Sequence, residues 1–157
     1  MSSVKTAGKV CLILLAFFLA REAHAACNVS TTSVSFGGYD SFRTIPMDST
    51  GSVTVSCDEV PPPDPVISIG PSGTTGGFNP RKMRHQSAPD TLQYNLYTTP
   101  SLNVVWGDGT AGTSTIRLKN VKRQKPPVVV TIYGRIPARQ DVRAGAYRDT
   151  LTVTITW

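Results

Sequence analysis

Apolar and polar residues alternate with a period of two along most of the chain after residue 26. The clearest case is residues 51–57, in which Val53, Val55 and Cys57 share one face and small polar residues occupy the other. The final segment, 148–157, alternates in the same way, with Leu151, Val153, Ile155 and Trp157 on one face and Thr150, Thr152, Thr154 and Thr156 on the other. This periodicity is typical of half-buried β-strands, and no helical period of useful length appears.

Further strands are predicted in short segments separated by turn residues: 28–36, 66–69, 92–97, 102–106, 113–118 and 128–133. The β-branched run 128–133 is predicted to be buried on both faces. Residues 61–63 (three prolines) and the Gly- and Ser-rich segment 71–80 are predicted loops, as is 81–90, and 107–109 is a predicted tight turn. Several short strands with turns between them indicate one all-β domain, a β-sandwich.

The N-terminus has the features of a signal peptide. Lys5 and Lys9 precede the apolar run 10–20, which is shorter than the roughly 20 residues of a membrane-spanning helix. The small residues of Ala23-x-Ala25 then form a cleavage site. We therefore expect residues 1–25 to be removed during export through the Sec pathway, leaving residues 26–157 as one domain. The alternative is lipidation of Cys27, which is disfavoured by His24 three residues before it.

The predicted export signal determines which cysteines remain in the mature chain. The chain has three cysteines, and Cys11 lies inside the predicted signal. Cys27 and Cys57 remain, and an oxidising compartment favours a disulfide between them, which would stabilise the fold by roughly 3–4 kcal/mol. A metal site is the alternative, but His85 is the only histidine after the signal, so we expect no metal.

The distribution of charged residues indicates one candidate binding surface. Without the predicted signal the chain keeps 13 basic and 9 acidic residues, a net charge of +4. Five basic residues lie close together in sequence: Arg117, Lys119, Lys122, Arg123 and Lys125. They indicate either a solvated turn or a surface that contacts an acidic polysaccharide or a cell surface. Nucleic-acid binding is not expected, because no aromatic residues are interleaved with them.

Catalytic motifs are not evident, and we expect neither an enzyme nor a cofactor. His85 is the only candidate general base and is predicted to be exposed in the loop 81–90. No small-molecule substrate is expected either. Aromatic residues would suit a sugar-binding surface, but Tyr94, Trp106 and Trp157 share faces with apolar neighbours and are predicted to lie in the core.

Several motifs in a fixed order resemble the spore coat protein U domain family, which also supplies subunits of archaic, Csu-type chaperone–usher pili. They include CNVS at 27–30, VSFG at 34–37, GSVTVSC at 51–57, RKM at 81–83, LQYNLY at 92–97, WGDG at 106–109, YGRIPARQ at 133–140 and GAYRDT at 145–150. Together they span nearly all of the chain after residue 26.

The resemblance implies an immunoglobulin-like β-sandwich that lacks its last strand. In such pili a periplasmic chaperone supplies the missing strand, an outer-membrane usher guides assembly, and a neighbouring subunit later donates its own strand. Partners would then be the chaperone, the usher and other pilus or coat subunits at the cell surface, with adhesion or biofilm formation as the outcome. The complementing strand is expected to pair along Leu151, Val153, Ile155 and Trp157.

One departure from the pilin pattern narrows this expectation. A donor strand needs about ten residues before the first domain cysteine, and cleavage after Ala25 would leave Ala26 alone ahead of Cys27. The expected role is therefore a terminal or minor subunit. The alternative is a stand-alone secreted β-sandwich module that binds a carbohydrate or a surface.

Overall fold

This computed structural model describes residues 27–57, 64–119 and 126–157. Within those ranges the chain forms nine strands: β1 (Cys27–Thr32), β2 (Met47–Cys57), β3 (Val66–Ile69), β4 (Arg81–His85), β5 (Thr91–Tyr97), β6 (Ile116–Arg117), β7 (Val128–Ile136), β8 (Tyr147–Arg148) and β9 (Val153–Thr156). The predicted all-β class is confirmed.

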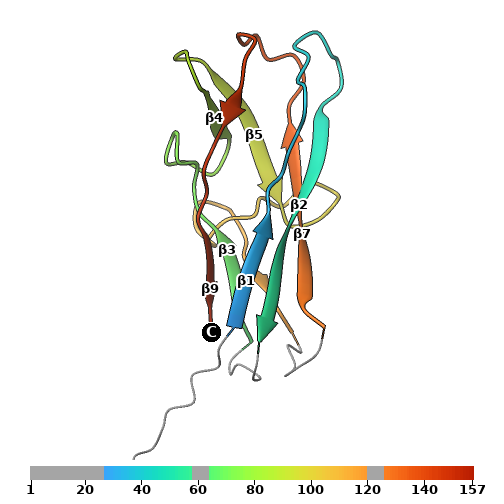
Figure 1. The fold of residues 1–157 in the computed structure, drawn as a ribbon, viewed down its shortest axis with the longest axis vertical. Coiled ribbons are helices and arrows are strands. Elements are labelled where there is room, and N and C mark those ends of the chain that lie inside the picture. The colour runs from blue at the N-terminus through green and yellow to red at the C-terminus, as the bar shows by residue number, and fades with distance from the viewer. Residues whose placement is uncertain (1–26, 58–63, 120–125) are drawn as a thin grey trace, which may run out of the picture.

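The strands form two antiparallel sheets. A six-stranded sheet has the order β1-β2-β7-β5-β4-β8, and a three-stranded sheet has the order β6-β3-β9. Figure 1 shows β3 and β9 running beside the longer β1, β2 and β7 along the long axis of the domain. Apolar faces of both sheets meet between them, as expected of an immunoglobulin-like sandwich.

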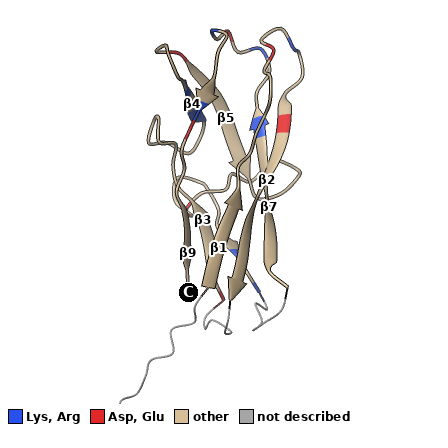
Figure 2. Cartoon of the chain, in the orientation of Figure 1, with Lys and Arg blue, Asp and Glu red and all other residues tan. Residues whose placement is uncertain are grey.

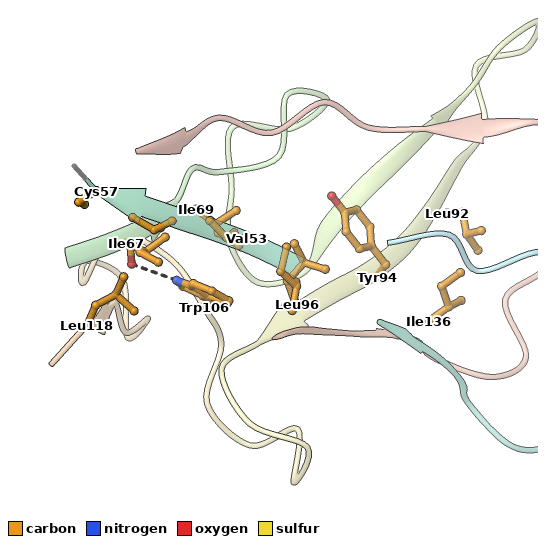
Figure 3. Close-up of a cluster of buried hydrophobic side chains, with 12 residues drawn as sticks. Val53, Cys57, Ile67, Ile69, Leu92, Tyr94, Leu96, Trp106, Leu118 and Ile136 are labelled. Atoms are coloured by element: carbon orange, nitrogen blue, oxygen red, sulfur yellow. Dashed lines mark hydrogen bonds between the residues drawn. The ribbon is translucent and has the colours of Figure 1, made fainter. Parts of the chain in front are cut away.

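The core draws on both sheets, because period-two alternation turns one face of each strand inward. Val53 and Val55 of β2 and Ile67 of β3 are at most 1% exposed. Trp106 is fully buried, and its indole Nε1 donates a hydrogen bond to the Ile67 carbonyl over 3.1 Å (Figure 3). Burial of each such side chain contributes about 1.5–3 kcal/mol, so these contacts fix how the two sheets face one another.

The predicted disulfide between Cys27 and Cys57 is confirmed. The two residues lie directly opposite each other in the register of β1 and β2. The bond therefore fastens the start of β1, an edge strand with no other neighbour in the described sheet, to the end of β2.

Arg81 is the largest polar group inside the sandwich. It belongs to β4 of the larger sheet and is fully buried. Its guanidinium donates hydrogen bonds to the carbonyls of Gly70 (2.9 Å) and Trp106 (2.8 Å) and to Oδ1 of Asn95 (2.9 Å). A further bond of 3.3 Å reaches the carbonyl of Ile69 at the end of β3. Burial lowers the pKa of Arg81, and these oxygen acceptors compensate its charge inside the protein.

The segment 81–90, predicted to be a loop, is in fact strand β4 followed by a short turn. His85, predicted to be exposed, is only 8% exposed. The prediction was wrong because Arg81 and His85 point inward while Arg84 points outward, which reverses the usual polarity of an alternating strand.

Five further predictions are corrected. Residues 128–133 are not buried on both faces, since Val129 is 61% exposed; one face of this antiparallel sheet meets solvent. Trp157 is 48% exposed because it lies beyond the last register pair of β9. The segment 148–157 is divided between β8 and β9, which belong to different sheets. Residues 102–106 form only isolated bridges, and β1 stops at Thr32.

Removal of the Arg81 guanidinium is expected to destabilise the sandwich strongly. The Arg81→Met variant keeps a long apolar side chain but leaves buried carbonyls without donors, so the free energy of unfolding should fall by about 3 kcal/mol or more. Urea unfolding measures this loss. Arg135→Met is the control, since Arg135 forms an exposed ion pair with Asp48, and its loss should be about 1 kcal/mol or less. Equal losses in the two variants would contradict the role of Arg81.

Candidate functional site

An open groove of about 1160 Å³ lies along the sandwich. One rim is the segment 31–42, which contains the end of β1, and the other is the segment 142–151, which contains β8 and leads to β9. The floor is made of core side chains: Ile69, Leu92, Tyr94, Leu96, Ile132 and Ile136. The groove therefore opens directly onto the hydrophobic core.

Two strand edges border this groove. Within the described residues β1 pairs only with β2, and β9 pairs only with β3. In Figure 1 both edge strands run along the long axis of the domain, and β3 is drawn between them. Free edges attract other strands, and proteins usually protect them with charges or proline.

Charge is distributed unevenly among the four sheet edges. The sequences of β1 (CNVSTT) and β9 (VTIT) contain no charged residue and no proline, as Figure 2 also shows. The other two edge strands, β6 and β8, each carry an arginine. At the groove, the edges of β1 and β9 thus lack the charges that discourage strand pairing, whereas β8 on the second rim carries Arg148.

The backbone of β9 shows which groups are free to pair. The amide of Gly70 donates to the carbonyl of Thr152 over 2.8 Å, so Thr152 points its backbone groups toward β3. Hydrogen bonding alternates along an antiparallel pair, and therefore the N–H and C=O groups of Val153 and Ile155 point toward the open edge.

Beyond Thr32 the first rim crosses over a glycine of the central strand β7. A Cβ atom on Gly134 would lie 2.7 Å from Val34 and 2.8 Å from Phe36, so only glycine lets this segment lie so close to the sheet. Phe36 then contacts Tyr94 edge to face, with ring centroids 6.2 Å apart. The segment fills the upper core without itself belonging to a sheet.

Tyr94 connects the floor to the second rim. Its hydroxyl donates to Oδ2 of Asp149 over 2.8 Å. Burial raises the pKa of Tyr94 well above its usual value, and the hydrogen bond to Asp149 adds to this shift. The phenol therefore stays protonated and holds the rim next to the core.

The residues predicted to pair with a complementing strand differ in their positions. Leu151 and Val153 line the groove, and Ile155 is half-buried in β9 outside the groove lining. Trp157 is exposed. The sequence did not point to a groove, because segments far apart in the chain make its floor and rims. The motifs VSFG at 34–37, LQYNLY at 92–97 and GAYRDT at 145–150 all contribute to it, but nothing in the sequence indicated that they meet.

The basic cluster is only partly described. Arg117 and Lys119 are exposed, and Arg117 donates to the carbonyl of Asp64 over 3.3 Å. Lys122, Arg123 and Lys125 lie outside the described residues. Across the described ranges, no three His, Cys, Asp or Glu residues are grouped as metal ligands would be. The same ranges hold no helix with the length and apolarity needed to cross a membrane.

Comparison with known proteins gives a match over most of the chain. Residues 13–154 match the model of the Spore Coat Protein U domain. Protein U of Myxococcus xanthus is 32% identical over 146 residues, covering 84% of this chain and 78% of that protein.

Comparison with solved structures gives matches at lower identity, and the first of them shares the fold. A chain in the crystal structure of the CsuC–CsuE chaperone–tip adhesion subunit pre-assembly complex, from archaic chaperone–usher Csu pili of Acinetobacter baumannii, is 20% identical with a TM-score of 0.58. The match covers 85% of this chain but only 40% of that chain. The Hda pilus minor tip subunit HdaB of E. coli is 11% identical with a TM-score of 0.44, covering 82% and 79% of the two chains.

The Tyr94–Asp149 contact predicts sensitivity to alkaline pH. Because the pKa of Tyr94 is raised by folding, its contribution to stability is complete below about pH 10, the unfolded value, and declines as pH rises further. Above that pH the free energy of unfolding should fall by up to about 1.4 kcal/mol per pH unit from this group. Urea unfolding between about pH 9 and 11 measures the slope. Tyr94→Phe should flatten it, and an unchanged slope would contradict the assignment.

Proposed function

Because the chain belongs to the Spore Coat Protein U domain family, we propose that it is an exported structural subunit of a surface pilus or coat that accepts a β-strand from a partner. The observation that carries this proposal is the groove that opens onto the core and is bordered in part by the uncharged edge strands β1 and β9. The sandwich is incomplete in this view, and the partner strand completes it.

The physical case rests on two kinds of contact. An incoming strand would hydrogen-bond to the free backbone groups of Val153 and Ile155, which supplies affinity without regard to sequence. Its alternate side chains would enter the groove and cover floor residues such as Leu96 and Ile132. Burial of this apolar surface supplies most of the free energy. Leu151 would contribute from the rim, and the exposed Trp157 would contact the end of the added strand.

The partners belong to the proposal and rest on the resemblance to chaperone–usher pilus subunits. A periplasmic chaperone would fill the groove before assembly, an outer-membrane usher would receive the complex, and another subunit would replace the chaperone strand. The structural relative comes from a chaperone–tip adhesion subunit pre-assembly complex, which supports a chaperone as the first partner.

Export and position in the assembly belong to the proposal as well. Removal of residues 1–25 as a signal peptide would place the protein in the periplasm, and from there it would reach the cell surface. One residue would then precede Cys27, which fits a terminal or minor subunit that accepts a strand, in a structure serving adhesion or biofilm formation. Its role is structural and not catalytic, and it needs no cofactor.

Strand acceptance predicts stabilisation by a free peptide. The probe is a capped synthetic peptide of about ten residues in which threonine alternates with valine or isoleucine, a usual strand length. At a concentration of 100 times its dissociation constant, the peptide should raise the free energy of unfolding of the protein by about 2.7 kcal/mol. Urea unfolding of the protein from periplasmic extracts measures this. A peptide with alternate residues changed to proline is the control. Equal stability with both peptides would overturn the proposal.

A pair of variants locates the binding edge in the same experiment. Ile155→Pro removes an N–H group that faces the open edge and is not bonded to β3, whereas Ile155→Ala removes only the side chain. Peptide affinity should fall much further for Ile155→Pro than for Ile155→Ala. Equal affinities for the two variants would mean that the strand does not pair with β9.

One observation favours the second candidate, a stand-alone module that binds a carbohydrate or a surface. Phe42 is 91% exposed and Ile45 is 58% exposed on the connection between β1 and β2. The basic residues Arg117 and Lys119 offer a different exposed surface for acidic glycans.

These apolar side chains predict adhesion without a partner strand. The double variant Phe42→Ser, Ile45→Ser should lower retention on an apolar surface by about tenfold if this loop makes the contact. Retention on hydrophobic beads, measured with and without the strand peptide, checks the effect. Val129→Ser, which removes an apolar side chain that is 61% exposed elsewhere, is the control. An equal loss of retention in the double variant and in Val129→Ser would mean that retention reflects general surface hydrophobicity and not this loop.

A further inference from the structure

Two arginines lie directly opposite each other on the outer face of the larger sheet. Arg84 of β4 faces Arg148 of β8 in the register of these strands. The neighbouring register pair is on the inner side, where His85 is buried and Tyr147 lines the groove. Because side chains alternate along a strand, the two arginines point to solvent, and both are exposed. Opposite residues have Cβ atoms about 4.5–5.5 Å apart, so these two positive charges repel each other.

Lys82 adds a third positive charge to the same face. It precedes Arg84 by two residues on β4, and its register partner on β5 is Gln93. Thr91 of β5 is opposite Arg84 in the same way. Figure 2 shows basic residues on β4, three of whose five residues are Lys or Arg. The three outward cations Lys82, Arg84 and Arg148, here called the β4–β8 patch, therefore lie beside an amide and a hydroxyl.

Acidic side chains do not neutralise the β4–β8 patch. In the part of the chain that the structure describes, none of its three cations forms an ion pair with a carboxylate. Two acids are near them in sequence, but both have other partners. The Asp90 carboxylate lies 3.7 Å from Arg143, and Asp149, which follows Arg148, accepts the hydroxyl of Tyr94. Like charges held opposite each other destabilise a sheet, and an anion bound between them removes this cost.

The chemistry of the patch favours carboxylates on a polysaccharide over other anions. An arginine guanidinium binds a carboxylate through two parallel hydrogen bonds, and the side chains of Gln93 and Thr91 offer hydrogen bonds to sugar hydroxyl groups. Stacking of nucleic-acid bases needs aromatic side chains, and insertion into a membrane needs apolar ones. The outward residues in the register of β4 with β5 and β8 are all polar.

We propose that the β4–β8 patch binds an acidic polysaccharide, with sugar carboxylates lying between Arg84 and Arg148 and beside Lys82. This inference goes beyond strand acceptance and does not depend on it, because the patch is on the outer face of the sheet whose inner face supplies floor residues of the groove. The patch is also distinct from the exposed residues Arg117 and Lys119, since β6 belongs to the smaller sheet. One molecule would thus hold a partner strand and a surface polysaccharide at the same time.

The test measures binding of polygalacturonate, a polymer of uronic acid, to the protein from periplasmic extracts by isothermal titration calorimetry. The double variant Arg84→Gln, Arg148→Gln should lower the affinity by about tenfold, the combined effect of two exposed ionic contacts. The matched control, Arg117→Gln, Lys119→Gln, removes the same charge from other exposed residues and should bind as the unaltered protein does. Affinity should fall as the salt concentration rises from about 0.05 M to about 0.5 M, and neutral dextran should not bind.

Three results would overturn the proposal. The first is absence of polygalacturonate binding by the unaltered protein. The second is an equal loss of affinity in the two double variants, which would mean attraction by net charge alone. The third is binding to vesicles of anionic phospholipid that needs Arg84 and Arg148 while polygalacturonate binding does not, which would identify the ligand as a lipid phosphate.

Urea unfolding provides an independent measurement of the repulsion between the two arginines. Without polysaccharide, the single variant Arg84→Gln should be at least as stable as the unaltered protein, because a like-charge pair is removed. Polygalacturonate should stabilise the unaltered protein more than it stabilises this variant, since a ligand that binds only the folded state raises stability according to its affinity. A variant that is less stable than the unaltered protein, or equally stabilised by the polymer, would contradict the proposal.

Discussion

The guanidinium of Arg81 is the contact on which the arrangement of the two sheets depends. It extends from the larger sheet to the carbonyls of Ile69 and Gly70 at the end of β3. A buried cation is tolerated only when it is fully hydrogen-bonded, and here every acceptor is a backbone or amide oxygen. The position of the smaller sheet is therefore fixed by a directional contact as well as by apolar packing.

This fixed region makes the open groove possible. At one end the Cys27–Cys57 bond holds β1 against β2, and in the middle Trp106 and Arg81 join the sheets. Farther along, the segment 33–42 leaves the sheet and Tyr94 holds the opposite rim through Asp149. The groove is thus bordered by segments that contacts within the chain hold in place.

Sequence periodicity predicted the parts of this fold in which apolar residues face inward. Val53, Val55 and Cys57 alternate as expected, and an even cysteine count in an exported chain was enough to predict the disulfide. Periodicity did not predict strand β4, because its inward-facing residues Arg81 and His85 are polar and resemble solvent-facing positions. It also failed for the groove, whose floor and rims come from segments far apart in sequence and are brought together only by the sheet order.

The edge strands provide the link between sequence and partner. A strand edge without charge is hazardous for a protein that remains alone, because it pairs with any compatible strand. Here β6 and β8 carry arginines, while β1 and β9 carry none, although β8 also lies at the groove. The difference is local, so a general scarcity of charge does not explain it. Uncharged edges beside an open groove are a hazard for a protein that stays alone, and this supports the proposal that a partner strand covers them.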